Sequence, residues 1–312
     1  MISYLLATLL YINNIDNSQE ILRQDFTVQD RISTALISSP YKSVYKISHP
    51  LPPLKKSDLV FPAQQVTARS AIAIDNMSGL TLWENNTDEV LPIASLTKLM
   101  TALVFIDHKV EFAQEITIEE ADNSNVQGSR LYVQIGEKMT VGDLFHASLV
   151  GSANNATKAL ARSTGLSEEE FISEMNKKAE IFGLVSTVFY DVTGLDPKNQ
   201  STAKEYSLIA RHAFGNTLIR EALGRGEYSF ATLEKEIHHT IQNTNMLLTD
   251  PELNLIGAKT GYLNEAGFTY VCQSEKNGNG VIIVLLNSAT SENRFTEAKE
   301  IIKWSHNNYI WI

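Results

Sequence analysis

The chain has 312 residues, of which 43% are hydrophobic, and its 26 Lys and Arg against 36 Asp and Glu give a formal net charge of −10. This is the composition of a globular protein with a core sufficient for one large domain or two modest ones. The acidic balance argues against nucleic acid as a partner. The single cysteine, Cys272, excludes an internal disulfide framework, and no apolar run of about 18 residues provides an ordinary transmembrane helix.

Two segments precede the first regular pattern. Residues 1–20 form a hydrophobic segment whose apolar stretch, 2–12, has the length of a signal-peptide core, although the first basic residue is Arg23 and no Ala-x-Ala-like site follows. Residues 21–65 contain five of the eight prolines and favour an extended linker. We therefore expect an exported chain, secreted or held peripherally at a membrane by its N-terminus. The alternative is a segment that packs on the domain or wraps it.

Regular patterns begin near Ala68 and define a domain over residues 66–312. Two strands, 71–75 and 80–84, form a hairpin because turn-forming residues separate them. Apolar spacing then predicts helices over 95–108, 141–163, 168–182, with Ser167 as the N-cap, and 203–214. A small hairpin over 228–231 and 236–241 follows.

The C-terminal part returns to strands and ends in a helix. The strands are 256–262, 268–274 and 281–287, and the helix is 294–306. Strands thus lie at both ends of the domain with a mostly helical block between them. This order predicts an α+β fold with one antiparallel sheet, helices on both its faces and a helical subdomain. No C-terminal β-domain is expected after the last helix.

Ser95-Leu96-Thr97-Lys98 begins the first of these helices. Residues i and i+3 share a helix face, so the Ser95 hydroxyl and the Lys98 amine can approach each other. Serine becomes a good nucleophile when a base takes its proton, and lysine can be that base when burial or positive charge lowers its pKa. Taken alone, the pattern is explained more simply by Ser95 as a helix N-cap.

Two further motifs carry polar side chains. Ser152-Ala153-Asn154 can aim a hydroxyl and an amide into one cleft, or merely interrupt a helix. Lys259-Thr260-Gly261 lies on a predicted strand, where its donors suit a carboxylate and the glycine leaves room for another backbone. The simpler interpretation of that segment is a sheet edge with a solvated lysine.

The order S-x-x-K, serine–asparagine element, K-T-G is the set shared by penicillin-binding proteins and class A β-lactamases. The chain resembles the low-molecular-weight penicillin-binding proteins, which are the serine D-alanyl-D-alanine carboxypeptidases of peptidase family S11, from about Ala68 to Ser305. Longer stretches strengthen the resemblance: 71–75 with its hairpin, 92–101, 194–196 followed by 201–203, and 259–268.

This resemblance implies the catalytic roles. Ser95 is the nucleophile that becomes acylated, and Lys98 takes its proton. Ser152 relays a proton to the leaving group, and Asn154 holds the substrate amide. The middle residue of that motif, Ala153, is often glycine or aspartate in the family, a difference that should alter packing more than chemistry.

The resemblance also implies the substrate-binding residues. Lys259 and Thr260 face the terminal carboxylate, and Gly261 lets the strand approach. The backbone N–H of Tyr262 completes an oxyanion hole with that of the nucleophile. Arg294 follows the strand 281–287, which places it near the sheet end beside the K-T-G strand, as a carboxylate-binding partner of Lys259.

The function implied is an extracytoplasmic serine carboxypeptidase that removes the terminal D-alanine of peptidoglycan stem peptides, with β-lactams as covalent inhibitors and no cofactor. A DD-endopeptidase of peptidoglycan cross-links is the alternative. A class A β-lactamase needs a glutamate for its deacylating water, whereas residues 181–204 hold only Asp191 and Asp196 as acids, so we expect slow deacylation.

Two other classes of function are disfavoured. A non-catalytic peptidoglycan-binding module with a relic site conflicts with the intact motifs, because the residues of such a site act as a unit. A metal site is not expected, since His238 and His239 are adjacent on a predicted strand and point to opposite faces.

Overall fold

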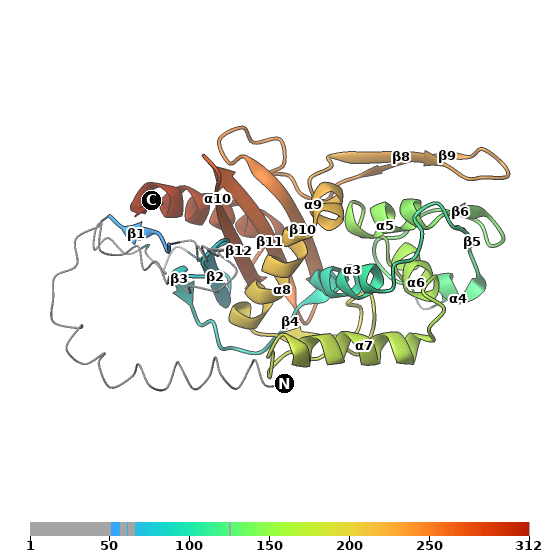
Figure 1. Cartoon of the computed structure of the whole chain (residues 1–312), viewed down its shortest axis with the longest axis horizontal. Coiled ribbons are helices and arrows are strands. Elements are labelled where there is room, and N and C mark those ends of the chain that lie inside the picture. The colour runs from blue at the N-terminus through green and yellow to red at the C-terminus, as the bar shows by residue number, and fades with distance from the viewer. Residues whose placement is uncertain (1–50, 57–60, 62–65, 125, 312) are drawn as a thin grey trace, which may run out of the picture. The chain divides into compact units, whose positions relative to one another are not determined.

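The computed structural model describes residues 51–56, 61, 66–124 and 126–311. Strands from the N-terminal and C-terminal parts of the domain pair in one five-stranded antiparallel sheet. Its strands are β2 (Ser70–Asp75), β3 (Thr81–Asn85), β10 (Leu255–Leu263), β11 (Gly267–Lys276) and β12 (Asn279–Ser288). The order β10-β11-β12-β2-β3 sets the blue early strands beside the orange and red late ones (Figure 1). All five correspond to predicted strands.

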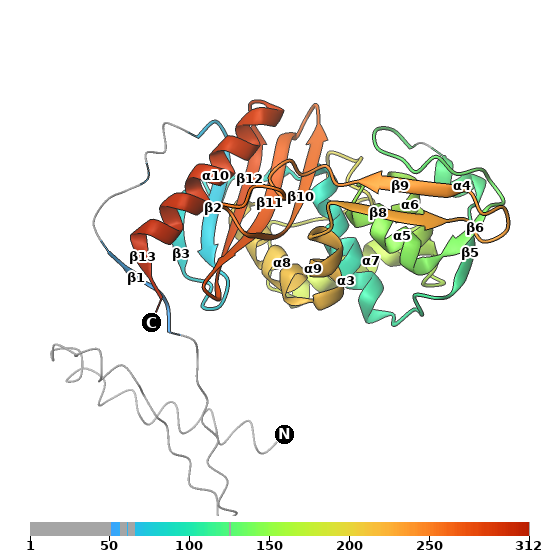
Figure 2. The same cartoon turned by 90° about the horizontal axis from the view of Figure 1, so that it is seen from above.

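Helices cover both faces of this sheet. Ile282 and Val284 of β12 belong to the core that includes α8 (Ala203–Gly215), whereas Ile283 belongs to the core that includes α10 (Ser291–Asn308). Successive strand residues face opposite sides, so a strand buried on both faces needs an uninterrupted apolar run. Figure 2 shows α10 lying along the sheet. The predicted α+β class, with helices on both faces, is confirmed.

A group of helices stands beside the sheet around α3 (Thr97–Asp107), whose side chains are buried along most of its length. The others are α4 (Glu120–Asn123), α5 (Val141–Leu149), α6 (Asn154–Arg162), α7 (Glu168–Ile181) and α9 (Thr217–Leu223). Helices α5, α6, α7 and α8 pack against α3, as a helix apolar on all sides requires. The predicted cap of α7 is present, because the Ser167 hydroxyl accepts the Glu170 N–H at 3.2 Å.

The single helix predicted over 141–163 is wrong. The chain forms α5 and α6, and the segment between them leaves helical geometry. Ser152 has a φ of 58°, in the left-handed region that helices do not use, and Ala153 is the extended N-cap of α6. The interruption of a helix that was the alternative interpretation of Ser152-Ala153-Asn154 is therefore observed.

Several short pairs of strands complete the fold. β8 (Glu227–Ala231) and β9 (His238–Gln242) form the predicted small hairpin. The others were not predicted: β1 (Leu54–Lys55) with β13 (Tyr309–Ile310), β4 (Leu91–Pro92) with β7 (Gln200–Ser201), and β5 (Glu115–Thr117) with β6 (Lys138–Thr140). Strands this short show no alternation of apolar and polar residues that a pattern could detect.

The predicted N-terminal segment, 1–20, lies outside the described residues, as does most of the predicted linker, 21–65. Within that linker, Phe61 packs its ring on Trp83 and Trp304, with ring centroids 5.4 and 6.0 Å away. No helix in the described part of the chain is long and apolar enough to cross a bilayer. The domain boundary at residue 66 stays a prediction.

Candidate active site

Ser95 lies in a one-turn 3-10 helix, Ala94–Leu96, directly before α3. The preceding residue, Ala94, has a φ of 49°, which is unusual for a residue with a side chain. Gly194 approaches so closely that a Cβ on it would lie 1.9 Å from the Ala94 carbonyl oxygen. The fold thus holds the Ser95 backbone by close packing and leaves its side chain partly exposed.

Lys98 lies one turn further and is fully buried. Its Nζ is 3.0 Å from Ser95 Oγ, and it donates to Asn154 Oδ1 and to the Thr193 carbonyl oxygen, both at 2.6 Å. Burial lowers the pKa of Lys98 to about 7, and the negative charge of Asp191 offsets part of that effect. The three partners fix the direction of the amine, which can accept the Ser95 proton once it is neutral.

A role for Lys98 as the base requires burial or a nearby positive charge to lower its pKa. The direction is as predicted, but burial is complete and is the dominant cause. The pKa of Lys259 is likewise lowered, by burial first and by the positive charge of Lys98 second.

This pKa predicts how acylation of Ser95 depends on pH. Only neutral Lys98 can take a proton, so below about pH 7 the rate of acylation by penicillin should fall by about tenfold per pH unit. The measurement is the labelling rate with fluorescent penicillin across pH, with circular dichroism at each pH to exclude unfolding. A rate that stays constant through pH 7 while the fold is intact would contradict the role of Lys98.

The second motif contacts both lysines of the site. Asn154, the first residue of α6, accepts from Lys98 and donates its own amide N–H to the Gln127 carbonyl oxygen at 2.7 Å. Ser152 is buried, and its hydroxyl accepts from Lys259 Nζ at 2.8 Å. The structure therefore brings Asn154 into contact with Lys98 of the first motif, and Ser152 into contact with Lys259 of the third.

Gly261 places strand β10 against the backbone of Ser95. A Cβ at this position would lie 3.0 Å from the Ser95 backbone nitrogen and 2.4 Å from Thr269 Oγ1, so a larger residue would push the strand away. The next residue, Tyr262, is 52% exposed, and its ring packs on Phe268 with centroids 4.5 Å apart. Tyr262 is therefore the residue next to the closest contact between strand β10 and the Ser95 backbone.

Lys259 and Thr260 add a cation and a hydroxyl on the same strand. Lys259 is buried and also donates to the Thr260 carbonyl oxygen at 3.0 Å. The hydroxyl of Thr260 lies 2.5 Å from that of Thr244, a residue that sequence reasoning missed. Thr244 lies in an irregular loop after β9, where no motif marks it.

Arg294 lies in the first turn of α10 beside β10, in the place predicted. Its guanidinium donates to the Gly261 carbonyl oxygen at 2.9 Å and to Ser291 Oγ at 3.1 Å. It also faces the rings of Phe268 and Phe295, 5.3 and 4.8 Å from their centroids. Only 8% of Arg294 is exposed, and its Nε has no hydrogen-bond partner among the described residues.

The site as a whole is electropositive. Lys259 and Arg294 are buried, and within the described residues neither forms an ion pair with a carboxylate. Buried cations are normally paired, because leaving water is costly for a charge. An anionic group of a ligand would supply the missing partner.

The loop before β7 supplies a backbone carbonyl group that the sequence did not reveal. The Thr193 carbonyl oxygen accepts from Lys98, and Asp191 holds that loop in shape. The Asp191 carboxylate accepts the backbone N–H groups of Thr193, Gly194 and Asp196, as well as the Thr193 hydroxyl. Asp191 is thus occupied by its own loop and poorly placed to activate a water, so slow deacylation of β-lactams stays our prediction.

The family model described as D-alanyl-D-alanine carboxypeptidase, Peptidase S11, matches residues 57–290. A D-alanyl-D-alanine endopeptidase of Pseudomonas aeruginosa is 30% identical over 241 residues, which are 77% of this chain and 78% of that relative. The D-alanyl-D-alanine carboxypeptidase DacC of Escherichia coli is 32% identical over 253 residues, 78% of this chain and 62% of the relative.

Solved structures agree with the sequence matches. The crystal structure of the Streptomyces K15 DD-transpeptidase is similar with a TM-score of 0.75 and 28% identity, covering 80% of this chain and 100% of that one. Penicillin-binding protein D2 from Listeria monocytogenes, in its ampicillin-bound form, has a TM-score of 0.69 at 28% identity and covers 78% of this chain. The predicted family of serine peptidases is confirmed, and the chain belongs to the D-alanyl-D-alanine carboxypeptidase family, S11.

Proposed function

We propose that this chain is a serine carboxypeptidase that removes the terminal D-alanine of peptidoglycan stem peptides through an acyl-enzyme on Ser95. The observation that carries the proposal is the 3.0 Å contact between the buried Lys98 amine and the Ser95 hydroxyl. Because burial lowers the pKa of Lys98 to about 7, much of this lysine is a free amine near neutral pH and can act as a general base.

Acylation follows from the contacts around this pair. Lys98 takes the proton of Ser95 Oγ, which attacks the carbonyl carbon of the penultimate D-alanine. The backbone N–H groups of Ser95 and Tyr262 hold the negative charge that develops on the carbonyl oxygen. As the C–N bond breaks, the proton that Lys98 took passes through the Ser152 hydroxyl, which Lys259 positions, to the departing D-alanine nitrogen. Water then cleaves the ester, which releases the shortened peptide and restores Ser95.

The unpaired cations support recognition of the substrate's C-terminal carboxylate. Lys259 and the Thr260 hydroxyl face it from strand β10, and Arg294 adds a charge from behind the Gly261 carbonyl group. A carboxylate entering here gains charge-assisted hydrogen bonds in a site that is largely shielded from water.

The role of Arg294 can be tested on two substrates. Arg294→Ala should lower kcat/KM for a peptide that ends in D-alanyl-D-alanine by roughly 10- to 150-fold, the scale of a charged hydrogen bond. The loss should be much smaller for the same peptide with an amidated C-terminus. Equal losses on both peptides would show that Arg294 supports strand β10 through Gly261 and does not bind the carboxylate of the substrate.

A DD-endopeptidase of cross-linked peptidoglycan is the second candidate, because relatives with each name match this chain at similar identity. The test is to incubate the protein with pentapeptide monomers and with cross-linked dimers and to identify the products by mass spectrometry, using Ser95→Ala as the blank. Release of D-alanine from monomers supports the carboxypeptidase. Cleavage of dimers alone would replace it with the endopeptidase.

The substrate also suggests a location and a class of inhibitor. Peptidoglycan lies outside the cytoplasmic membrane, so we place the enzyme there, secreted or tethered through residues 1–20. The Listeria relative was solved with ampicillin bound, and we propose that β-lactams acylate Ser95 of this chain in the same way.

A further inference from the structure

Lys98 can act as the base only while two segments that are distant in sequence keep a fixed separation. Its amine contacts the Ser95 hydroxyl, in the turn before α3, and the Thr193 carbonyl oxygen, in the loop before β7. A relative displacement of about 1 Å would lengthen one of these contacts beyond a hydrogen bond, and an error of that size can cost about a hundredfold in rate. A residue that holds the loop against α3 can therefore affect catalysis without touching the substrate.

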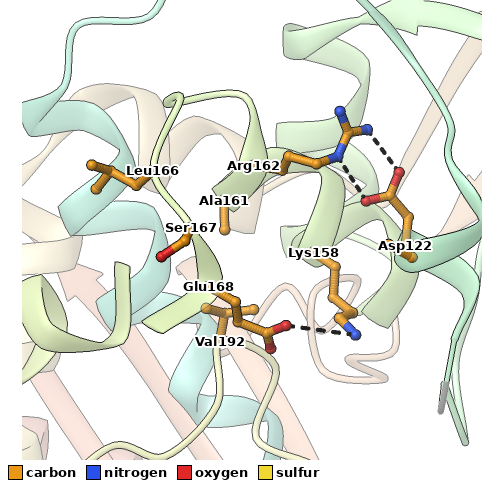
Figure 3. A pocket seen from close by; sticks show the side chains of 9 residues that line it. Asp122, Lys158, Ala161, Arg162, Leu166, Ser167, Glu168 and Val192 are labelled. Atoms are coloured by element: carbon orange, nitrogen blue, oxygen red, sulfur yellow. Dashed lines mark hydrogen bonds and ion pairs between the residues drawn. The ribbon is translucent and has the colours of Figure 1, made fainter. Parts of the chain in front are cut away.

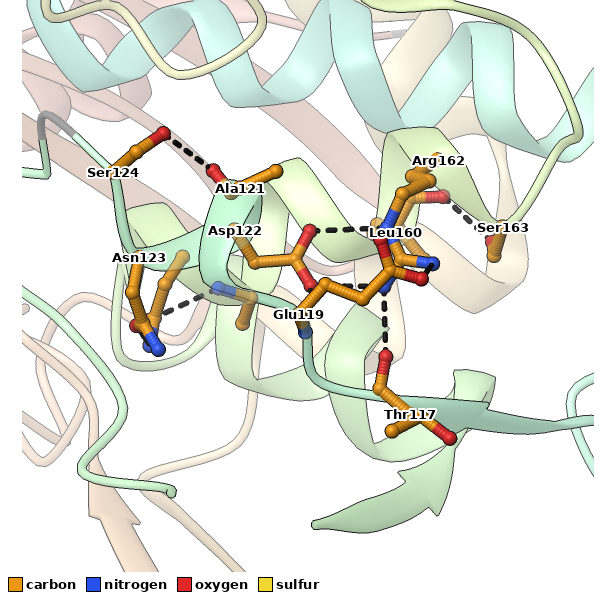
Figure 4. Close-up of polar contacts among 11 residues, drawn as sticks. Thr117, Glu119, Ala121, Asp122, Asn123, Ser124, Leu160, Arg162 and Ser163 are labelled. Carbon is orange, nitrogen blue, oxygen red and sulfur yellow. Dashed lines mark hydrogen bonds and ion pairs between the residues drawn. The ribbon is translucent and has the colours of Figure 1, made fainter. Parts of the chain in front are cut away.

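Side-chain packing alone does not fix this loop. Residues 191–198 border a cavity of about 650 Å3, and Val192 lines a second cavity of about 200 Å3 beside helix α6 (Figure 3). The wall of the second cavity is held in place, because Arg162 donates to both oxygens of the buried Asp122 and to Glu119 (Figure 4). Since few atoms press on the loop from these two sides, its position depends on polar contacts.

Asn199 supplies such contacts to both segments at once. Its amide N–H groups donate to Thr97 Oγ1, in the first turn of α3, at 3.0 Å and to the Asp191 carbonyl oxygen at 2.9 Å. Its amide oxygen accepts the backbone N–H groups of Tyr190 and Asp191 at 2.6 and 3.1 Å. Its backbone carbonyl oxygen accepts the N–H of Ile93, two residues before the nucleophile, at 3.0 Å. Asn199 is fully buried, and its amide uses all its hydrogen-bonding positions.

The influence of Asn199 continues through Asp191 to the base itself. Asn199 holds the backbone of Asp191, whose carboxylate accepts the N–H and the hydroxyl of Thr193. Thr193 in turn presents its carbonyl oxygen to the Lys98 amine. Because Lys98 follows Thr97 directly in the chain, these contacts form a closed hydrogen-bond circuit, Thr97–Asn199–Asp191–Thr193–Lys98.

We propose that Asn199 is a positioning residue for the general base, which locks the loop that carries Thr193 to the first turn of α3 and so holds the Lys98 amine on the Ser95 hydroxyl. The inference rests on the proposed function, because it takes Lys98 as the group that accepts the Ser95 proton. The competing interpretation is a buried asparagine that stabilises the fold and leaves the chemistry of Lys98 unchanged.

Release of the loop would change the surroundings of Lys98 in a definite direction. The Thr193 carbonyl oxygen and the charge of Asp191 both stabilise the protonated amine, so moving them away lowers its pKa further. The amine is then neutral at lower pH, and the acid limb of the acylation profile moves to lower pH while the maximal rate falls. Among the described residues, the charged groups that face this amine are Asp191 from the loop and Lys259 from β10, whereas α6 and the turn before α3 present the uncharged Asn154 and Ser95.

Two variants open the circuit at different points. Asn199→Ala removes four side-chain hydrogen bonds. It should lower the maximal rate of acylation by fluorescent penicillin by roughly 10- to 100-fold, and it should move the midpoint of the pH profile down by about 0.5–1 unit. Thr97→Val removes only the acceptor on α3 with little change of shape, so the rate should fall by roughly three- to tenfold, with a midpoint shift in the same direction.

Asn176→Ala is the matched control. Asn176, on α7, also holds the backbone near this loop, since it donates to the Phe189 carbonyl oxygen at 2.8 Å and accepts the Phe189 N–H at 2.9 Å. Within the described residues, its side-chain hydrogen bonds reach neither α3 nor Asp191. Its loss should lower the melting temperature but leave the acylation rate and the midpoint unchanged, because backbone bonds between Val188 and Gln200 keep this segment in place.

Melting temperatures show which variants fold, and each rate is referred to the folded protein. If folded Asn199→Ala and Thr97→Val acylate normally, or slow down without a shift of the midpoint, Asn199 only stabilises the fold and the inference is refuted while the proposed function stands. Losses of the same size in Asn176→Ala would refute it as well. If Asn199→Ala does not fold, Thr97→Val decides by the same criteria. If penicillin does not label the unaltered enzyme, the proposed function itself fails, and this inference fails with it.

Discussion

Lys98→Arg should reduce the rate at which penicillin acylates Ser95 by roughly a thousandfold, within the range that a general base contributes. Arginine keeps the positive charge but does not release a proton at any pH the fold tolerates. The amine it replaces is fully buried and touches Ser95, Asn154 and the Thr193 carbonyl group, so no water can easily take over its task.

Fluorescent-penicillin labelling over time measures this loss, and mass spectrometry of the unaltered protein should place the adduct on the peptide that contains Ser95. Because a guanidinium is larger than an amine, Lys98→Gln provides a second variant of smaller volume, and the melting temperature of each shows whether it folds. Lys177→Arg, on the exposed side of α7, is the matched control. Near-normal labelling of both folded Lys98 variants would exclude Lys98 as the base.

Gly194→Ala should lower both stability and acylation. The new Cβ would lie 1.9 Å from the Ala94 carbonyl oxygen, and the φ of 88° at this position is unfavourable for alanine. Together, the overlap and the backbone strain should cost roughly 2–4 kcal/mol, or about 4–10 °C in melting temperature for a domain of this size. Relief of the overlap must move the backbone that carries Ser95, and a shift of about 1 Å can cost about a hundredfold in rate.

Gly165→Ala separates the effect of backbone strain from the effect of the overlap with Ala94. Gly165 has a similar φ of 83°, but no atom lies within 4 Å of the position its Cβ would take. It should therefore lose only the about 1–2 kcal/mol of left-handed backbone strain, and its labelling rate should stay normal. If Gly194→Ala matched Gly165→Ala in both measurements, the close approach to Ala94 would have no part in placing the nucleophile.

The sheet and the three motifs could be predicted because their patterns are local. The apolar run of β12 and the turn before it are visible in the sequence, and the spacing of Ser95 and Lys98 fixes their common helix face. The approach of Arg294 to the K-T-G strand was predicted from chain order and from the resemblance. Its bond to the Gly261 carbonyl group was not, because an arginine reaches many acceptors from one backbone position.

Other parts of the site depend on contacts that no pattern encodes. The break between α5 and α6 follows from the left-handed backbone of Ser152, which is stabilised by neighbours distant in sequence, such as Lys259. The Thr193 carbonyl oxygen could come from any residue type, so its contact with Lys98 leaves no trace in the sequence. The hydroxyl pair of Thr244 and Thr260 likewise exists only once the loop after β9 has folded against the sheet.

The pairing of β2 with β12 also sets when activity can first arise. Ala73 lies opposite Ile283, so the middle of the sheet closes only after nearly the whole domain has been synthesised. Contacts between such remote parts of a chain form slowly, because a long loop must be ordered before they contribute. Ser95 emerges early, but the strand that carries Lys259 and Gly261 emerges late. In a nascent chain, Ser95 is therefore present before the strand that carries Lys259 and Gly261, and we expect neither substrate nor antibiotic to acylate it before folding is complete.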